Sequence, residues 1–199
     1  MMLLETTTVP EATLPLSDFK AHLRMGTGFA DDGAQDAVLY GFLRAALSAI
    51  EGRTGNVLFE RGFSWRVDSW RDRQAVGLPV APVSAVTEFD IVDATDDVTS
   101  ISAESWRLQQ DMQVPRVLTL GVALPTIPRG GFARFGFTAG YGADWDDVPA
   151  DLRQAVMMLA AHYYEYRNDT ALDAGCMPFG VSALIDRYRP MRLTGGGAS

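Results

Sequence analysis

The apolar residues of this 199-residue chain change their spacing twice, and that change limits the folds the chain can adopt. Before about Gly55 they recur every three or four residues, as on one face of an α-helix. Between about Leu58 and Thr138 they alternate with polar residues, as in half-buried strands, and after Pro149 the helical spacing returns. The pattern predicts an α+β fold: a small bundle of about four helices, with an antiparallel β subdomain inserted between the second and third helices.

The strand signals are short and are separated by turns. Phe63, Trp65 and Val67 alternate with polar residues, and further candidates lie at 83–91, 106–108, 117–120 and 132–137. Prolines at 79, 82, 115, 125 and 128 fall between them. Such short connections cannot supply the crossovers that parallel strands need, so we expect an antiparallel arrangement with a core that includes Phe63, Trp65 and Trp70.

The third helix carries the clearest start signal. Gly140-Tyr141-Gly142 ends the preceding extended segment, and the acidic residues Asp144, Asp146 and Asp147 come just before a helix N-terminus, where negative charge is favourable. Pro149 suits the first helical turn. The expected helix-packing and assembly core consists of Leu152, Ala155, Val156, Leu159 and Tyr163 from this helix, with Val38, Phe42 and Ile50 from the second.

The domain organisation follows from these periods. Residues 1–14 lack an apolar pattern and are expected to form a flexible arm, as is the glycine-rich tail at 189–199. The helical core is expected over 15–57 and 145–188, and the inserted β subdomain with its connecting turn over 58–144.

Composition narrows the class of protein. A hydrophobic content of 47% supports a folded chain, and the single cysteine, Cys176, cannot form an intramolecular disulfide, which favours a reducing cytoplasm. No apolar run approaches the roughly 20 residues that span a bilayer. The formal net charge of −8 argues against a protein that grips nucleic acid, because such binding depends on lysine and arginine.

Six short motifs follow one another in a definite order along the chain. They are Leu16 to Arg24, Asp31-Asp32, Glu51-x-x-Thr54-Gly55, Ala139-Gly140-Tyr141-Gly142, Val148-Pro149-x-x-Leu152-x-x-Ala155, and Tyr164-Glu165-x-Arg167. In this order and spacing they resemble the head-tail connector (adaptor) proteins of tailed phages and phage-like gene transfer agents. The motifs cover both ends of the chain and leave the middle unmatched, so the inserted β subdomain departs from the mostly helical minimal adaptor.

The resemblance implies a structural protein without catalytic residues, cofactor or metal. It implies a ring, commonly dodecameric, of copies that are monomers when free, assembled in the host cytoplasm and then part of the particle. The ring would bind the portal, receive a tail-side stopper or head-completion protein, and let DNA pass through its channel without specific binding. It also implies that the C-terminal segment docks onto the portal, which here means Arg187, Tyr188, Arg189, Pro190, Met191, Arg192 and Leu193.

Two other classes of function remain open from the residues alone. One is a small cytoplasmic hydrolase that uses Cys176 with a histidine, or the aspartate cluster at Asp144–Asp151. The other is a domain that binds a small ligand between the helices and the strands. The Asp144–Asp151 run lacks the central glycine and terminal glutamate of a calcium loop, which favours helix capping.

Overall fold

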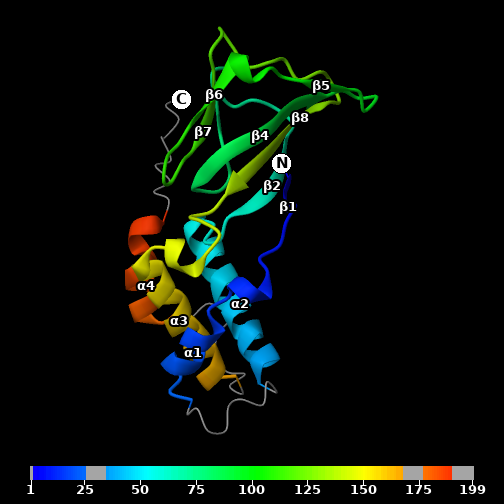
Figure 1. The fold of residues 1–199 in the computed structure, drawn as a ribbon. Coiled ribbons are helices and arrows are strands. Elements are labelled where there is room, and N and C mark those ends of the chain that lie inside the picture. The colour runs from blue at the N-terminus through cyan, green and yellow to red at the C-terminus, as the bar shows by residue number, and fades with distance from the viewer. Residues whose placement is uncertain (1, 26–34, 168–176, 190–199) are drawn as a thin grey trace.

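Helices and sheets occupy opposite ends of an elongated molecule (Figure 1). The computed structural model describes residues 2–25, 35–167 and 177–189. The helices are α1 (Leu16–His22), α2 (Asp36–Thr54), α3 (Ala150–Glu165) and α4 (Phe179–Ile185), with strands β2 to β8 between α2 and α3 in chain order. This arrangement confirms the predicted α+β class.

The ends of the two long helices follow the sequence signals. Gly55 ends α2 in the left-handed conformation, with φ of 72°, and its N–H donates to the Glu51 carbonyl. Pro149 precedes the first residue of α3, where its missing N–H costs no hydrogen bond. Both boundaries therefore arise from local backbone chemistry.

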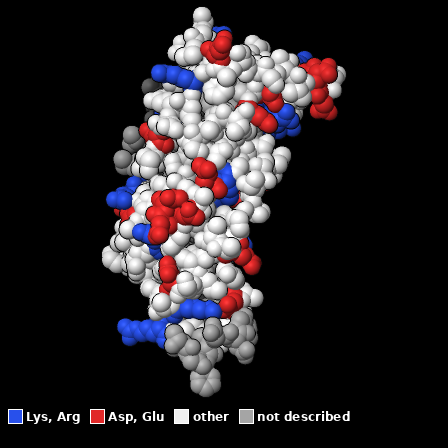
Figure 2. Space-filling view, viewed as in Figure 1, with Lys and Arg blue, Asp and Glu red and all other residues white. Residues whose placement is uncertain are grey.

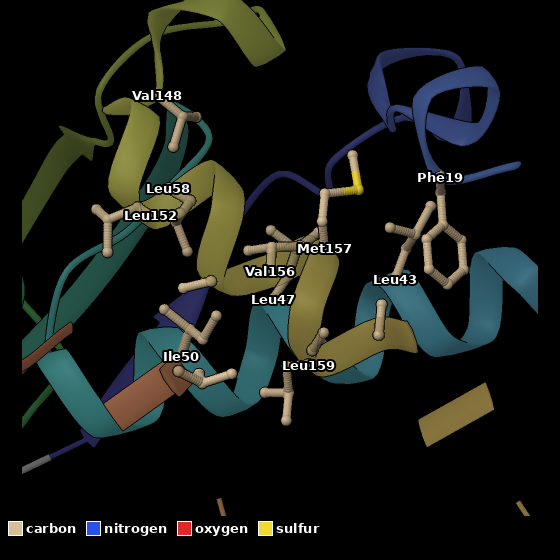
Figure 3. Close-up of a cluster of buried hydrophobic side chains, with 14 of the residues drawn as sticks. Phe19, Leu43, Leu47, Ile50, Leu58, Val148, Leu152, Val156, Met157 and Leu159 are labelled. Carbon is tan, nitrogen blue, oxygen red and sulfur yellow. The ribbon is translucent and has the colours of Figure 1, made fainter. Parts of the chain in front are cut away.

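The helical end has its own hydrophobic core, formed mainly between α2 and α3 (Figure 3). Its fully buried members include Leu43, Ile50, Leu152 and Leu159. Further members include Phe19 of α1, Leu39, Ala46, Leu58, Phe59, Ala155, Val156, Val181 and Ile185. Because Leu58 and Phe59 belong to this cluster, the helical core extends past the predicted boundary at residue 57.

The strands form two antiparallel sheets. The five-stranded sheet has the order β1-β2-β8-β4-β5, and the three-stranded sheet has the order β3-β7-β6. The bounds are β1 Met2–Glu5, β2 Arg61–Val67, β3 Ala75–Gly77, β4 Val83–Val92, β5 Val98–Ser100, β6 Trp106–Gln109, β7 Arg116–Thr119 and β8 Phe132–Ala139. The predicted strands are confirmed, and β1, β3 and β5 are additional.

A second core lies at the sheet end. Phe135 of β8 is fully buried, and its ring stacks 4.4 Å from the ring of Phe89 on β4. Val117 of β7 is also fully buried in this cluster, so the smaller sheet packs against the larger one. Trp70 and Trp65 pack there as well, in agreement with the predicted β core.

The expectation of a flexible N-terminal arm is wrong for its first strand. Met2–Glu5 forms β1, which pairs antiparallel with β2 and places Leu3 opposite Trp65. The Thr6 N–H continues the ladder by donating to the Gly62 carbonyl at 2.9 Å. The pairing has a clear cause, since β2 would otherwise expose its backbone N–H and C=O groups at the edge of the sheet.

The glycine turn after β8 brings two parts of the backbone very close. Gly140 has a φ of 137°, and a Cβ at this position would lie 2.4 Å from the backbone nitrogen and Cα of Glu60. The next residues then bond back across the turn: Tyr141 N–H donates to the Leu58 carbonyl, and Gly142 accepts from Glu60 N–H. Only glycine fits this crossing, which leads the chain from the sheet to α3.

Candidate assembly surfaces

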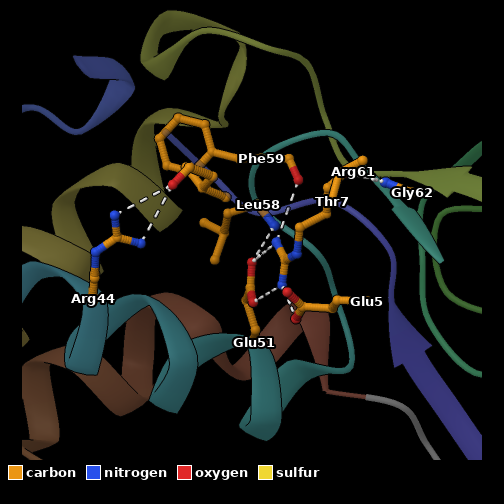
Figure 4. A network of polar contacts seen from close by, with 9 residues as sticks. Glu5, Thr7, Arg44, Glu51, Leu58, Phe59, Arg61 and Gly62 are labelled. Carbon is orange, nitrogen blue, oxygen red and sulfur yellow. Dashed lines mark hydrogen bonds and ion pairs between the residues drawn. The ribbon is translucent and has the colours of Figure 1, made fainter. Parts of the chain in front are cut away.

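A network of hydrogen bonds and ion pairs connects the helical end to the sheet end (Figure 4). Arg61, at the start of β2, donates to both carboxylate oxygens of Glu51 on α2, at 3.0 and 2.7 Å, and to Glu5 of β1 at 2.9 Å. Glu51 also accepts the Leu58 N–H at 2.8 Å. The Arg61 and Glu51 side chains are only 8% and 16% exposed. Burial opposes the charge of Arg61, but the hydrogen bonds to Glu51 and Glu5 outweigh it and hold its pKa above the ordinary value.

The acidic run before α3 caps a short 3-10 helix, Trp145–Asp147, and not α3 itself, whose N-cap residue Pro149 is without a side-chain capping bond. Asp144 and Asp147 form a capping box, in which the Asp147 carboxylate accepts the Asp144 N–H at 3.0 Å. Asp146 pairs with Arg153, one turn into α3. The Asp151 carboxylate accepts hydrogen bonds from the Leu152 N–H in α3 and from the Tyr188 hydroxyl in the C-terminal segment. Each carboxylate therefore already has a partner within the fold.

The first part of the predicted docking segment is tied to α3. The Tyr188 hydroxyl donates to Asp151 at 2.8 Å, and Arg187 pairs with the other oxygen of Asp151 at 2.8 Å. The Arg187 carbonyl accepts from Gln113, in the turn between β6 and β7, at 3.1 Å. Tyr188 is only 8% exposed and belongs to the helical core. The Tyr188 side chain therefore packs within its own chain, while portal docking by the segment Arg187–Leu193 stays a prediction.

The rest of the predicted docking segment differs in its environment. The Arg189 side chain is 53% exposed and pairs loosely with Asp186 at 3.4 Å. Pro190, Met191, Arg192 and Leu193 lie outside the described residues.

Tyr141 lies close to the Tyr188 and Asp151 side chains. Its hydroxyl accepts a hydrogen bond from Asn56, and burial raises the pKa of Tyr141 to about 12.

The predicted helix-packing stripe is correct on α3 and shifted on α2. Leu152, Ala155, Val156 and Leu159 are buried, and Tyr163 is half-buried. On α2, Ile50 is buried and Phe42 packs edge-on against Tyr164, with 6.0 Å between ring centroids. Val38 is 52% exposed and lies outside the core, because Leu39 and Leu43 occupy the buried face instead.

Several exposed apolar side chains lie on the sheet end, where sequence reasoning named no binding residue. Met2 and Leu4 on β1, and Val98 on β5, are each just over half exposed. Val122, in the loop after β7, is 92% exposed. The β1 and β5 residues lie on the two edges of the larger sheet. Edge strands depend on long-range pairing, and a four-residue strand carries too little pattern to reveal it.

The described residues offer no support for a metal site. None of them forms a group of three or more histidine, cysteine, aspartate or glutamate side chains that could hold a metal ion. Cys176 and the Asp31-Asp32 motif lie outside the described residues. His162 contacts Tyr166, with 4.7 Å between ring centroids. Within the described part of the chain, no helix has both the length and the apolar character to cross a bilayer.

Charges of both signs are mixed on the face shown in Figure 2, where acidic and basic side chains lie next to one another at several places. Described ion pairs include Lys20 with Asp36 at 2.6 Å and Arg66 with Asp68 at 2.9 Å. This face therefore lacks the continuous basic surface that phosphate binding requires.

Known proteins of similar structure come from one kind of particle. A chain from the neck of an empty gene transfer agent (GTA) particle, computed with C6 symmetry, has a TM-score of 0.89 and 53% identity, and the match covers 98% of this chain and 99% of the other. A chain from the virion of a native GTA particle gives 0.87 and 52%, with the same coverage. A chain from the neck of a native GTA particle, computed with C12 symmetry, gives 0.84 and 47%, also over 98% and 99%.

No family model matches this chain, and no curated protein matches it. The structural matches nevertheless extend over nearly the full length of both chains at 47–53% identity, and they agree with the ordered motifs at the two ends of the sequence. The chain therefore belongs to the family of head-tail connector proteins of tailed phages and gene transfer agents, which are structural components of the particle and not enzymes.

Proposed function

We propose that this protein is the adaptor of a phage-like gene transfer agent, whose copies form a ring under the portal and link it to the next head-completion or tail protein around the DNA channel. The observation that best supports this role is the 53% identity, over 98% of the chain, to a protein of a GTA neck. That neck was computed with C6 symmetry, and a second with C12 symmetry. In a cyclic ring each copy makes the same heterologous contact with the next, and a dodecamer suits both symmetries.

Removal of the gene tests the role directly. Without the protein, we expect heads that are filled or empty but carry no tails, because the portal lacks the platform for the next neck protein. Electron microscopy of purified particles, with and without a restored gene, measures the tailed fraction. Particles that acquire tails normally in the absence of the gene would contradict the proposal.

The C-terminal segment is the proposed contact with the portal. Asp151 holds Arg187 and Tyr188 against α3, so the chain that follows leaves the helical end from a fixed point. Arg189 and Arg192, interleaved with Met191 and Leu193, combine positive charge with apolar contact area, as interface residues often do. We propose Arg189 to Leu193 as the binding part of this segment and Arg187 with Tyr188 as its internal anchor.

A pair of truncations tests this division. Deletion of residues 190–199 should leave a folded protein, because the anchor at Tyr188 stays in place. This protein should no longer join portal rings, because the binding part of the segment is removed. Deletion of residues 194–199 is the matched control, since it keeps Arg192 and Leu193, and should bind portal as the full chain does. Cosedimentation with purified portal measures both. Equal binding by the two truncations would contradict the docking role.

The free protein is proposed to be a monomer in the host cytoplasm that forms its ring on the portal. Ordering of a terminal segment only on contact with its partner favours assembly in sequence over premature polymerisation. Size-exclusion chromatography with light scattering should give a mass near 21.7 kDa without portal. A stable ring in the absence of portal would contradict this step.

DNA is proposed to pass through the channel without specific binding, and a tail-side stopper or head-completion protein to bind the opposite side of the ring. The net charge of −8 supports weak contact with DNA, because like charges repel and leave the duplex free to slide. We expect no shift of duplex DNA by the purified protein at low salt. Strong, salt-sensitive binding would contradict this part.

A further inference from the structure

Within the described part of the chain, the outer edges of the two end strands of the larger sheet pair with no further strand. β1 and β5 are the first and last strands in its order, and all three residues of β5 are exposed. Figure 1 shows β1 at the margin of the sheet, next to β2. We propose that β1 of one copy pairs in parallel with β5 of the next copy in the ring, with Leu3 opposite Thr99. This inference rests on the proposed ring.

The directions of the strands decide the type of contact. Each neighbouring pair in the five-stranded sheet is antiparallel, so the first and fifth strands have the same sense in the sheet order, apart from the twist that accumulates between them. Opposite edges of two copies in the same orientation therefore meet as parallel strands. Pairing of β1 with β1, or β5 with β5, needs a two-fold axis between the two copies, and neighbours in a cyclic ring are not related by one.

The unpaired backbone groups on the two edges are complementary. Because Thr6 N–H points inward to Gly62, alternation along an antiparallel ladder turns the N–H and C=O of Leu3 outward. The inward bond from Ile101 N–H to Phe89 likewise turns Val98 and Ser100 outward. In the proposed register, Leu3 N–H donates to the Val98 carbonyl, and Ser100 N–H donates to the Leu3 carbonyl.

The side chains agree with this register. Leu3 packs toward the core of the sheet end, and Thr99 lies opposite Ile91, which belongs to the same core, so both point to the inner face. Their neighbours Met2 and Val98 then share the outer face, where each is 52% exposed. Pairing brings these two apolar side chains together. β1 also lacks the lysine or proline that commonly protects a free edge from pairing.

Paired cysteines in assembled particles test the contact. In a Cys176→Ser background, Met2→Cys with Val98→Cys places thiols on facing strands of neighbouring copies, and mild oxidation should give a ladder of covalent multimers on a non-reducing gel. The matched control combines Met2→Cys with Thr99→Cys. Its second thiol lies on the opposite face of the sheet, so it should give no ladder above the level of the single-cysteine variants.

Three results would overturn the inference. The first is the absence of a ladder in purified necks that contain the double variant. The second is crosslinking by either single-cysteine variant, which indicates a symmetric contact. The third is a ladder from the control pair that equals the ladder from the test pair. Hydrogen exchange of the unmodified protein supplies a measurement without substitutions: the Leu3 and Ser100 amides should exchange at least tenfold more slowly in the neck than in the free protein. Unchanged exchange overturns the pairing, whereas absence of the protein from purified necks overturns the proposed function and this inference with it.

Discussion

The helical end and the sheet end of the molecule are assembled from the chain in different ways. α1 and α2 precede the strands and α3 and α4 follow them, so the helical core joins segments that are far apart in sequence. The sheet end is one continuous stretch from β2 to β8, with β1 added at its edge. Each end has a separate cluster of buried residues. Two separate hydrophobic cores can therefore belong to one fold when a small set of contacts between them, here called the joint, connects them.

That joint combines a buried ion pair with aromatic contact. Arg61 and Glu51 connect β2 to α2, and Phe59 stacks on Trp145 with 5.9 Å between ring centroids. Since both contacts lie where the chain passes between the two ends, we expect the ends to unfold together. The predictions below test this expectation, from the largest effect to the smallest.

Phe135→Ala should produce the largest loss of stability. Phe135 is fully buried between Phe89 and Trp65, and its removal leaves a cavity that costs about 3–5 kcal/mol. Leu159→Ala is the matched change at the helical end, at about 2–5 kcal/mol. In urea, both variants should shift tryptophan fluorescence and helical circular dichroism at the same midpoint. Separate midpoints for the two signals in Phe135→Ala would show that the ends unfold independently.

Arg61→Ala should cost about 3 kcal/mol, because it leaves the Glu51 carboxylate buried without its charged partner. Arg189→Ala is the control, as the exposed pair of Arg189 with Asp186 contributes less than about 1 kcal/mol. Urea unfolding measures both. A loss in Arg61→Ala no greater than in the control would mean that the ion pair does not hold the joint.

Tyr188→Phe should cost about 1 kcal/mol, since it removes one hydrogen bond to Asp151 while the ring stays packed. Portal binding should weaken with it, because the anchor of the C-terminal segment is loosened. Tyr166→Phe serves as the control at a 48% exposed position. A stable Tyr188→Phe protein with unchanged portal affinity would separate the anchor from docking.

Val38→Ala should have the smallest effect, within about 0.5 kcal/mol, because Val38 is half exposed. Leu39→Ala, one residue further along α2, should cost about 2–5 kcal/mol, because Leu39 is fully buried. Thermal unfolding of the two variants locates the buried face of α2. Similar losses would mean that Val38 is covered, which in the free monomer contradicts the structure.

Much of the fold could be predicted from local chemistry. Gly55 and Pro149 set helix ends through backbone constraints that act on one or two residues, and the alternation of Phe63, Trp65 and Val67 marks one buried face of a strand. These signals need no knowledge of the partner segment. For that reason the class, the helix positions and the main strands were correct.

The sequence was least informative where distant contacts decide. On α2, a stripe through Val38 and Phe42 and a stripe through Leu39 and Leu43 both have helical spacing, and only packing against α3 selects the second. β1 finds its partner on a strand that lies beyond α1 and α2 in the sequence. The burial of Tyr188 depends on Asp151 in a different helix. None of these contacts leaves a periodic signal in the sequence.

The split helical core also imposes an order in time. During translation, α2 leaves the ribosome before any of β2 to β8 has been made, and α3 and α4 come last. The sheet end can fold while the apolar side of α2 still lacks its cover, and exposed surfaces of that kind attract chaperones and promote aggregation. Nascent chains that stop before α3 keep this surface bare, so the helical core can close only in copies that are completed through α4.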